Sequence, residues 1–190
     1  MAKETAPKEK EETSAVSTAF DIVSVLTTAV VAVAVAFIFC FRTVGVVGSS
    51  MYPTLHDTDR IILSAFETKP ARGQIVVTCQ PSSDPVIPDT LVKRVIATAG
   101  ETVDIDFERG VVYVDGEALE EPYVNEPTHR REDFTQPVTV PDGYVFVMGD
   151  NRNNSTDSRS ESVGLIREEY ILGKALFRIF PIGRFALERY

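Results

Sequence analysis

Residues 91–97 read Leu-Val-Lys-Arg-Val-Ile-Ala, a short run in which apolar and β-branched residues surround two adjacent basic ones. Runs of this length and composition are typical of β-strands. Glycine and proline separate such runs, as at Pro141-Asp142-Gly143. The runs lie at 61–63, 74–79, 91–97, 111–114, 144–148 and 171–180. We therefore predict that residues 42–190 form a mainly β domain, with one short helix at 162–170.

Residues 22–41 carry no charge and are bounded by Asp21 and Arg42. As a helix these 20 residues would span about 30 Å, the thickness of a bilayer core. The alternatives are a buried core helix and a cleaved signal peptide, whose apolar region is only about 7–15 residues long and ends at a small-x-small site. This longer run ends Phe-Ile-Phe-Cys-Phe, so we predict an uncleaved transmembrane anchor over residues 20–41.

The charges around the anchor predict its orientation. Lys3, Lys8 and Lys10 precede it, and the positive-inside rule counts lysine and arginine while largely ignoring glutamate. Residues 1–19 are polar, and we predict that they form a disordered tail on the cytoplasmic side of the cell membrane. Residues 42–190 would then be extracytoplasmic. The net charge of −9, without a basic cluster, argues against nucleic acid as a partner.

Ser50 is the candidate nucleophile. It opens Ser-Met-Tyr-Pro-Thr-Leu, in which Pro53 fixes its own φ and favours an extended Tyr52. Nine positions separate Phe41 from Ser50 and reach roughly 30 Å when extended, so a site at Ser50 would lie near the membrane. The alternative is an ordinary Gly-Ser turn.

Lys93 is the candidate general base. Strand alternation places it on one face with Leu91, Val95 and Ala97, and Arg94 on the other. Burial on an apolar face lowers the pKa of an ammonium, and a general base must be neutral near the working pH. Lysine tolerates such burial and arginine does not. The alternative is a lysine that extends to solvent from an edge strand.

A dense polar loop runs from Gly149 to Arg159. It is compatible with plain turns capped by Asn and Asp, or with a calcium loop, although Arg152 occupies a ligand position. A third interpretation is a support loop, in which Ser155 orients a neutral Lys93 and Asp157 pairs with Arg159. His56 and His129 are the only histidines, so a Ser-His-Asp triad stays open, while two histidines and one thiol after the anchor make zinc improbable.

The sequence resembles bacterial type I signal peptidases of the smaller, Gram-positive type. The resemblance lies in the anchor, the Ser-Met-Tyr-Pro-Thr-Leu stretch, Asp59-Arg60-Ile61-Ile62, Lys93-Arg94-Val95-Ile96 and the loop 149–159. Type I signal peptidases are membrane-anchored serine proteases that remove signal peptides from secreted proteins. The resemblance covers nearly the whole chain and implies a largely antiparallel β catalytic domain with its substrate groove near the membrane, where preprotein signal peptides are cut after Ala-x-Ala. The partners expected are preproteins and the lipid bilayer. Action alone and action beside the protein export channel both stay open.

The resemblance also assigns roles to residues. Ser50 is implied to be the nucleophile and Lys93 the general base, with Ser155 orienting Lys93. Asp157 and Arg159 are implied to hold the site, and no metal or cofactor is implied. Two departures are visible: residues 97–101 read Ala-Thr-Ala-Gly-Glu instead of a Gly-Leu-Pro-Gly-Asp-like run, and Gly48 stands where some members have a serine that helps the oxyanion. The backbone N–H of Ser50 would then serve the oxyanion.

Two other classes compete with a signal peptidase. Soluble self-cleaving repressor-type proteases share a Ser–Lys dyad, but the anchor argues against them. A non-catalytic membrane-anchored binding domain would not need Ser50 and Lys93, and both are present. Residues 116–139 are irregular and polar, and we interpret them as a small insertion.

Overall fold

The computed structural model describes residues 8–65, 69–81 and 90–181, without side chains for residues 8–16, 36, 38 and 39, and it divides the chain into two units after Cys40. The first unit is helix α1 (Lys8–Cys40), which contains a span, Ser17–Val35, long and apolar enough to cross a membrane. A helix that is apolar all round needs an apolar medium, as the anchor prediction requires. The described part of the chain is helical from Lys8, so the predicted disorder of residues 8–19 is wrong, while the same prediction for residues 1–7 lies outside the described residues.

The second unit is built on a seven-stranded antiparallel sheet in which non-consecutive strands are neighbours. Its order is β1 (Phe41–Gly45), β2 (Arg60–Ser64), β11 (Ile171–Phe180), β3 (Ile75–Cys79), β4 (Thr90–Ala97), β9 (Tyr144–Met148) and β10 (Ile166–Arg167). Strand β4 lies between β3 and β9, and Lys93 pairs with Val76 of β3. The strand that carries Lys93 is therefore internal, and its backbone is held on both sides.

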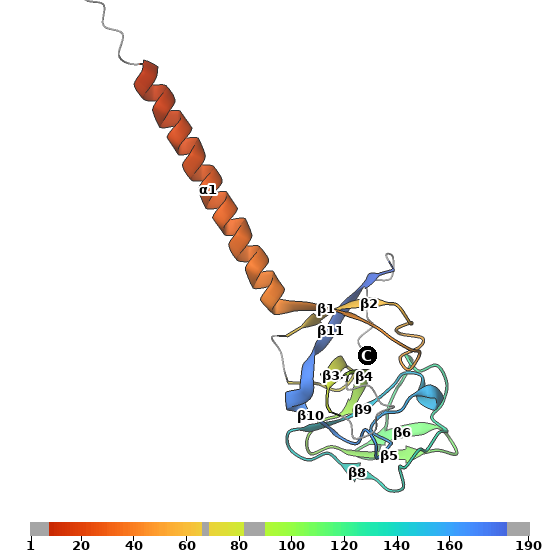
Figure 1. Cartoon of the computed structure of the whole chain (residues 1–190). Helices are drawn as coiled ribbons and strands as arrows, with labels where there is room; N and C mark the ends of the chain where they lie inside the picture. Colours follow the sequence, from red (N-terminus) through yellow and green to blue (C-terminus); the bar gives the residue numbers. More distant parts are fainter. Residues whose placement is uncertain (1–7, 66–68, 82–89, 182–190) are drawn as a thin grey trace, which may run out of the picture. The chain divides into compact units, whose positions relative to one another are not determined.

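A smaller antiparallel sheet lies beside the large one (Figure 1). Its order is β7 (Glu117–Ala118), β6 (Val111–Val114), β5 (Thr102–Asp106) and β8 (Val138–Thr139). Residues 116–139 contribute β7 and β8 to its two edges. The segment interpreted as an insertion is therefore attached to this sheet at both ends.

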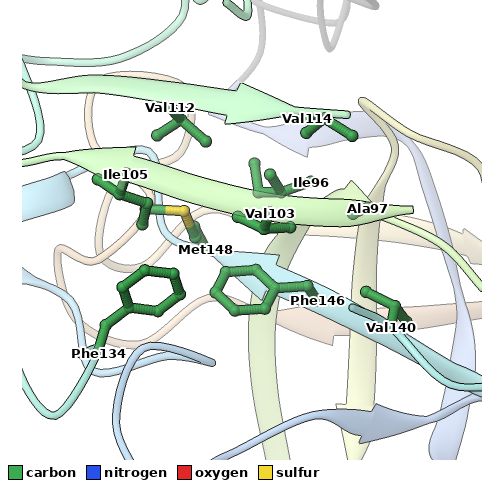
Figure 2. Close-up of a cluster of buried hydrophobic side chains, with 10 residues drawn as sticks. All are labelled: Ile96, Ala97, Val103, Ile105, Val112, Val114, Phe134, Val140, Phe146 and Met148. Carbon is green, nitrogen blue, oxygen red and sulfur yellow. The ribbon is translucent and has the colours of Figure 1, made fainter. Parts of the chain in front are cut away.

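A buried apolar cluster joins the two sheets (Figure 2). Its members come from β4 and β9 of the large sheet, from β5 and β6 of the small sheet, and from the connecting segment: Ile96, Ala97, Val103, Ile105, Val112, Val114, Phe134, Val140, Phe146 and Met148. Two further clusters cover the two faces of β3, since Ile75 and Val77 belong to one and Val76 to the other. This double burial explains why β3 reads as a continuous apolar run.

The mainly β fold with one N-terminal apolar helix is confirmed, and each of the six predicted runs contains a strand. The predicted helix at 162–170 is wrong. Within it, Ile166 pairs with Val145 in β10, and residues 168–170 form a single 3₁₀ turn, η2 (Glu168–Tyr170). Glu168 N–H donates to Gly143 O at 2.8 Å, so contacts with β9 and the turn before it override local helix propensity.

Candidate active site

Ser50 lies in a turn that apolar neighbours fasten to the core. Met51 and Leu55 are buried in the cluster on one face of β3, and Leu55 N–H donates to Met51 O at 2.9 Å. Ser50 itself stays partly accessible. Two positions before it, Gly48 has a φ of +86° and donates its N–H to Asp57 Oδ1 at 2.9 Å. A residue with a side chain would be strained there, which accounts for glycine at this position.

Lys93 reaches Ser50 from the internal strand β4. Its Nζ lies 2.7 Å from Ser50 Oγ, although the two residues are 43 positions apart in the chain. The lysine is 3% exposed. Burial lowers the pKa of Lys93, and Asp157 opposes this shift while Arg159 adds to it. The site therefore joins a hydroxyl to an amine that is biased toward its neutral form.

The loop after β9 packs directly against the Ser50 turn. Asn151 N–H donates to Ser50 O at 3.0 Å, and Asn151 Nδ2 donates to Ser49 O at 3.1 Å. A Cβ placed on Gly149 would collide with Ser50 O and with Ser155 Oγ. Glycine at 149 thus allows a close approach between the loop and the nucleophile turn.

Ser155 contacts the acidic member of the loop. Its Oγ donates to Asp157 Oδ2 at 2.8 Å, and Gly149 N–H donates to the same oxygen at 2.9 Å. No hydrogen bond joins Ser155 to Lys93 among the described residues. The structure thus places Ser155 beside the site, where its hydroxyl orients the carboxylate of Asp157.

Asp157 and Arg159 form a two-point ion pair that has no exposed surface. Arg159 Nε donates to Oδ1 at 2.8 Å and Nη2 donates to Oδ2 at 2.9 Å. Burial alone would raise the pKa of Asp157, but the bonds and charge of Arg159 hold it below its ordinary value. The guanidinium also bonds to the carbonyl oxygens of Arg130 and Arg152. The pair therefore fixes the loop from inside.

A second buried pair, which the sequence did not reveal, joins β4 to the start of the loop. Arg94 Nε and Nη2 donate to Asp150 at 2.8 and 2.6 Å, and Arg94 Nη1 donates to Gly73 O at 2.8 Å. Thr54, four residues after Ser50, donates its hydroxyl to the same carboxylate. Arg94 is fully buried because every side of its guanidinium is engaged, including a stack on the Tyr123 ring at 3.8 Å. An acidic residue directly before Asn151 was the only available signal.

Neither histidine lies at the serine. His129 Nδ1 contacts Phe107 O at 2.9 Å, and the ring of His56 packs edge-on against Tyr52. The histidine-triad alternative therefore does not fit the geometry. Among the residues that the structure describes, no group of three or more histidine, cysteine, aspartate or glutamate side chains is placed to hold a metal ion.

Comparison with known proteins identifies the class. Residues 19–180 match the family described as signal peptidase, peptidase S26. The chain is 42% identical to the probable signal peptidase I-1 of Synechocystis over 143 residues, 71% of this chain and 69% of that one. It is 37% identical to a signal peptidase I of Bacillus amyloliquefaciens over 92% of this chain and 95% of the relative. It is 39% identical to signal peptidase I T of Bacillus subtilis over 76% of this chain and 77% of the relative.

The chain belongs to the signal peptidase family, peptidase S26. The predicted resemblance to bacterial type I signal peptidases is thereby confirmed, as is the prediction of a serine peptidase, a hydrolase, of the signal peptidase I type.

Proposed function

We propose that this chain is a membrane-anchored endopeptidase that cleaves signal peptides from exported preproteins after small residues, with Ser50 and Lys93 as its catalytic dyad. One observation carries the proposal: a buried amine, Lys93 Nζ, lies 2.7 Å from the Ser50 hydroxyl. The lowered pKa of Lys93 supports it, because a neutral amine accepts a proton and an ammonium does not.

The reaction follows from this contact. Neutral Lys93 takes the proton of Ser50, and Ser50 Oγ attacks the carbonyl carbon of the scissile amide. When the tetrahedral intermediate collapses, the carbon–nitrogen bond breaks and Lys93 gives its proton to the leaving amine. Water then enters and gives a proton to Lys93. The hydroxide oxygen attacks the acyl carbon, and the bond between this carbon and Ser50 Oγ breaks. Ser50 recovers its proton from Lys93.

The oxyanion is stabilised by the backbone of the nucleophile turn. The described residues offer the Ser50 N–H no hydrogen-bond acceptor, while Ser50 O is occupied by Asn151. A free N–H beside the attacking oxygen is suited to a negative oxygen of the substrate. Gly48 has no side chain to assist.

The loop 149–159 acts as a support in this proposal. Asp157 and Arg159 hold its shape, and Ser155 fixes the Asp157 carboxylate that lies in range of Lys93. We assign Ser155 an indirect role in orienting Lys93, by way of Asp157, instead of the direct hydrogen bond to Lys93 that the support-loop interpretation implies.

Substrate and enzyme share one membrane in this proposal. The apolar part of helix α1 from residue 20 onward is the single anchor, residues 1–19 are cytoplasmic, and residues 42–190 are extracytoplasmic, where preproteins emerge from the export channel. Two-dimensional confinement raises the effective concentration of the signal peptide at the enzyme. Protease added to intact spheroplasts should degrade residues 42–190; protection there, with digestion in inverted vesicles, would contradict this orientation.

The decisive test is cleavage of a preprotein with an Ala-x-Ala site by the detergent-solubilised full-length protein. Ser50→Ala and Lys93→Ala should abolish cleavage while leaving the fold intact by circular dichroism. Lys69→Ala is the matched control for Lys93→Ala, since its side chain is exposed. Ser49→Ala is the control for Ser50→Ala, and it removes only an exposed hydrogen bond that Ser49 Oγ accepts from Asn154 Nδ2. A leucine in place of the alanine before the cut should block cleavage. Activity surviving in either dyad variant would show that the nucleophile or the base is another residue.

A further inference from the structure

Glu132 is a buried carboxylate in an unfavourable setting. Its φ is +53°, a left-handed conformation that non-glycine residues adopt at a cost. Its side chain is 5% exposed, and neither oxygen has a hydrogen bond of good geometry among the described residues, with the Asp157 backbone N–H as its one weak donor. The nearest cation recorded is Arg130, whose Nη2 lies 3.3 Å from Oε1 and whose own side chain is half exposed.

The backbone on both sides of Glu132 is fastened to the support loop. Before it, Arg130 O accepts from Arg159 Nη1 at 2.8 Å. After it, Asp133 N–H donates to Arg159 O at 3.2 Å, and Asp133 Oδ2 accepts from Ser160 Oγ at 3.0 Å. These contacts hold the left-handed turn that directs the glutamate inward.

Four charged or titratable groups interact electrostatically with this carboxylate. They are Arg130, in contact at 3.3 Å, Asp157 and Arg159 of the support loop, and Lys93 of β4. Burial raises the pKa of Glu132 and so does Asp157, while Arg159 and Arg130 oppose the rise. Glu132 in turn acts on Lys93, where its negative charge, like those of Asp157 and Asp150, raises the pKa that burial lowers, while Arg159 adds to the lowering.

An ordinary structural role does not explain this arrangement. A left-handed glutamate is strained, and burial of a carboxylate without a well-formed hydrogen bond is more costly still. An asparagine or glycine would turn the chain at lower cost. Groups that violate local rules in this way gather at functional sites, and this one lies within electrostatic range of Lys93.

We propose that Glu132 is a positioning residue that supplies a further buried negative charge, beside those of Asp157 and Asp150, for the ammonium that Lys93 becomes when it takes the proton of Ser50. This inference rests on the dyad assigned under the proposed function. Glu132 touches neither substrate nor the reacting atoms, and acts by stabilising the charged form of Lys93. Asp157 is paired at two points with Arg159, whereas the one ion pair of Glu132 is the longer contact with Arg130, and the charge of Arg159 acts on Glu132 from a distance.

The test uses full-length protein in detergent micelles with ¹³C-labelled lysines. Glu132→Gln should move the titration of Lys93 to lower pH, since an ammonium loses favourable charge. The acid limb of the cleavage rate should move in the same direction, and the plateau rate should fall because a less basic amine accepts a proton less readily. Lys93→Met identifies the Lys93 resonance by its absence.

Two matched variants make the result decisive. Glu132→Asp keeps the charge and tolerates a left-handed backbone, so it should retain most of the wild-type titration. Glu126→Gln removes the same charge from an exposed position in the same segment and should move nothing. An unmoved Lys93 titration in Glu132→Gln would overturn the inference, even if the variant melts at a higher temperature. If Glu132→Gln moves the Lys93 titration but the wild-type protein cleaves no preprotein, the result would support the inference and contradict the proposed function.

Discussion

Arg159 donates two hydrogen bonds to the Asp157 carboxylate, with Nε 2.8 Å from Oδ1 and Nη2 2.9 Å from Oδ2, and neither side chain has exposed surface. The remaining capacity of Asp157 Oδ2 is taken by Gly149 N–H and by the Ser155 hydroxyl. One ion pair thus determines the conformation of the loop that packs on Ser50.

Asp157→Asn should destabilise the domain by about 3–5 kcal/mol, because it leaves the buried guanidinium of Arg159 without a counter-charge. Urea unfolding at neutral pH measures the change. Glu169→Gln removes an exposed partner, since Arg167 and Glu169 are 51% and 63% exposed, and should cost less than about 1 kcal/mol. Equal effects of the two substitutions would mean that the Asp157–Arg159 pair does not support the loop.

Gly149→Ala should disturb the site through space alone. The added methyl would overlap Ser50 O and Ser155 Oγ, and overpacking of this kind costs about 1–3 kcal/mol. Cleavage should fall with stability, since the nucleophile turn must move. Gly45→Ala meets no atom within 4 Å and should stay within about 0.5 kcal/mol of wild type. A fully active Gly149→Ala enzyme would show that the contact with Ser50 O is dispensable.

Lys93→Met should abolish cleavage and stabilise the fold. The folded-state pKa of Lys93 lies below its ordinary value of 10.5, so between the two values the unfolded chain binds a proton that the folded chain does not. The free energy of unfolding therefore rises with pH across that window. Methionine removes this dependence, so the variant should be the more stable protein at neutral pH, with the gap closing toward pH 10.5.

Thermal unfolding of both proteins from pH 6 to pH 10.5 measures that gap. Lys69→Met, at an exposed lysine, should leave the pH dependence of the wild type unchanged. A constant difference between wild type and Lys93→Met at every pH would show that the lysine is not buried in a way that disfavours its charge.

The sequence predicted the strands with clear apolar runs and the residues of the dyad, because these depend on local patterns. It missed β1, β5, β7, β8 and β10. Two-residue strands such as Ile166–Arg167 exist only through their partners. Strands β1 and β5 read Phe-Arg-Thr-Val-Gly and Thr-Val-Asp-Ile-Asp, in which polar residues interrupt the apolar ones. Alternation along β4 also failed locally: a register shift between Val95 and Ala97 places Ile96 and Ala97 in one cluster.

The polar interior was the least predictable part of the site. Arginine was judged unsuited to burial, yet Arg94 is fully buried with a partner 56 positions away. The Ser155 hydroxyl bonds to Asp157, and Glu132 gave no sequence signal at all. The energy of a buried polar group is decided by its partner in space, and one sequence does not record that partner.

Arg94→Lys should separate charge from geometry at the second buried pair. Lysine keeps the positive charge but loses the two-point contact with Asp150, the bond to Gly73 O and the stack on Tyr123. We expect a loss of about 2–4 kcal/mol in the free energy of unfolding. Cleavage should also fall, because Asp150 directly precedes Asn151, whose N–H holds Ser50 O.

Arg72→Lys is the matched control for Arg94→Lys. Arg72 also pairs with a carboxylate, Glu101, but these two side chains are 39% and 23% exposed, against 1% and 0% for Arg94 and Asp150. Solvent replaces a lost contact at the exposed pair, so stability should change by less than about 1 kcal/mol. Equal losses of stability at both positions would mean that the two-point contact of Arg94 with Asp150 contributes nothing. The positive charge that lysine keeps would then be sufficient to hold β4 to the loop.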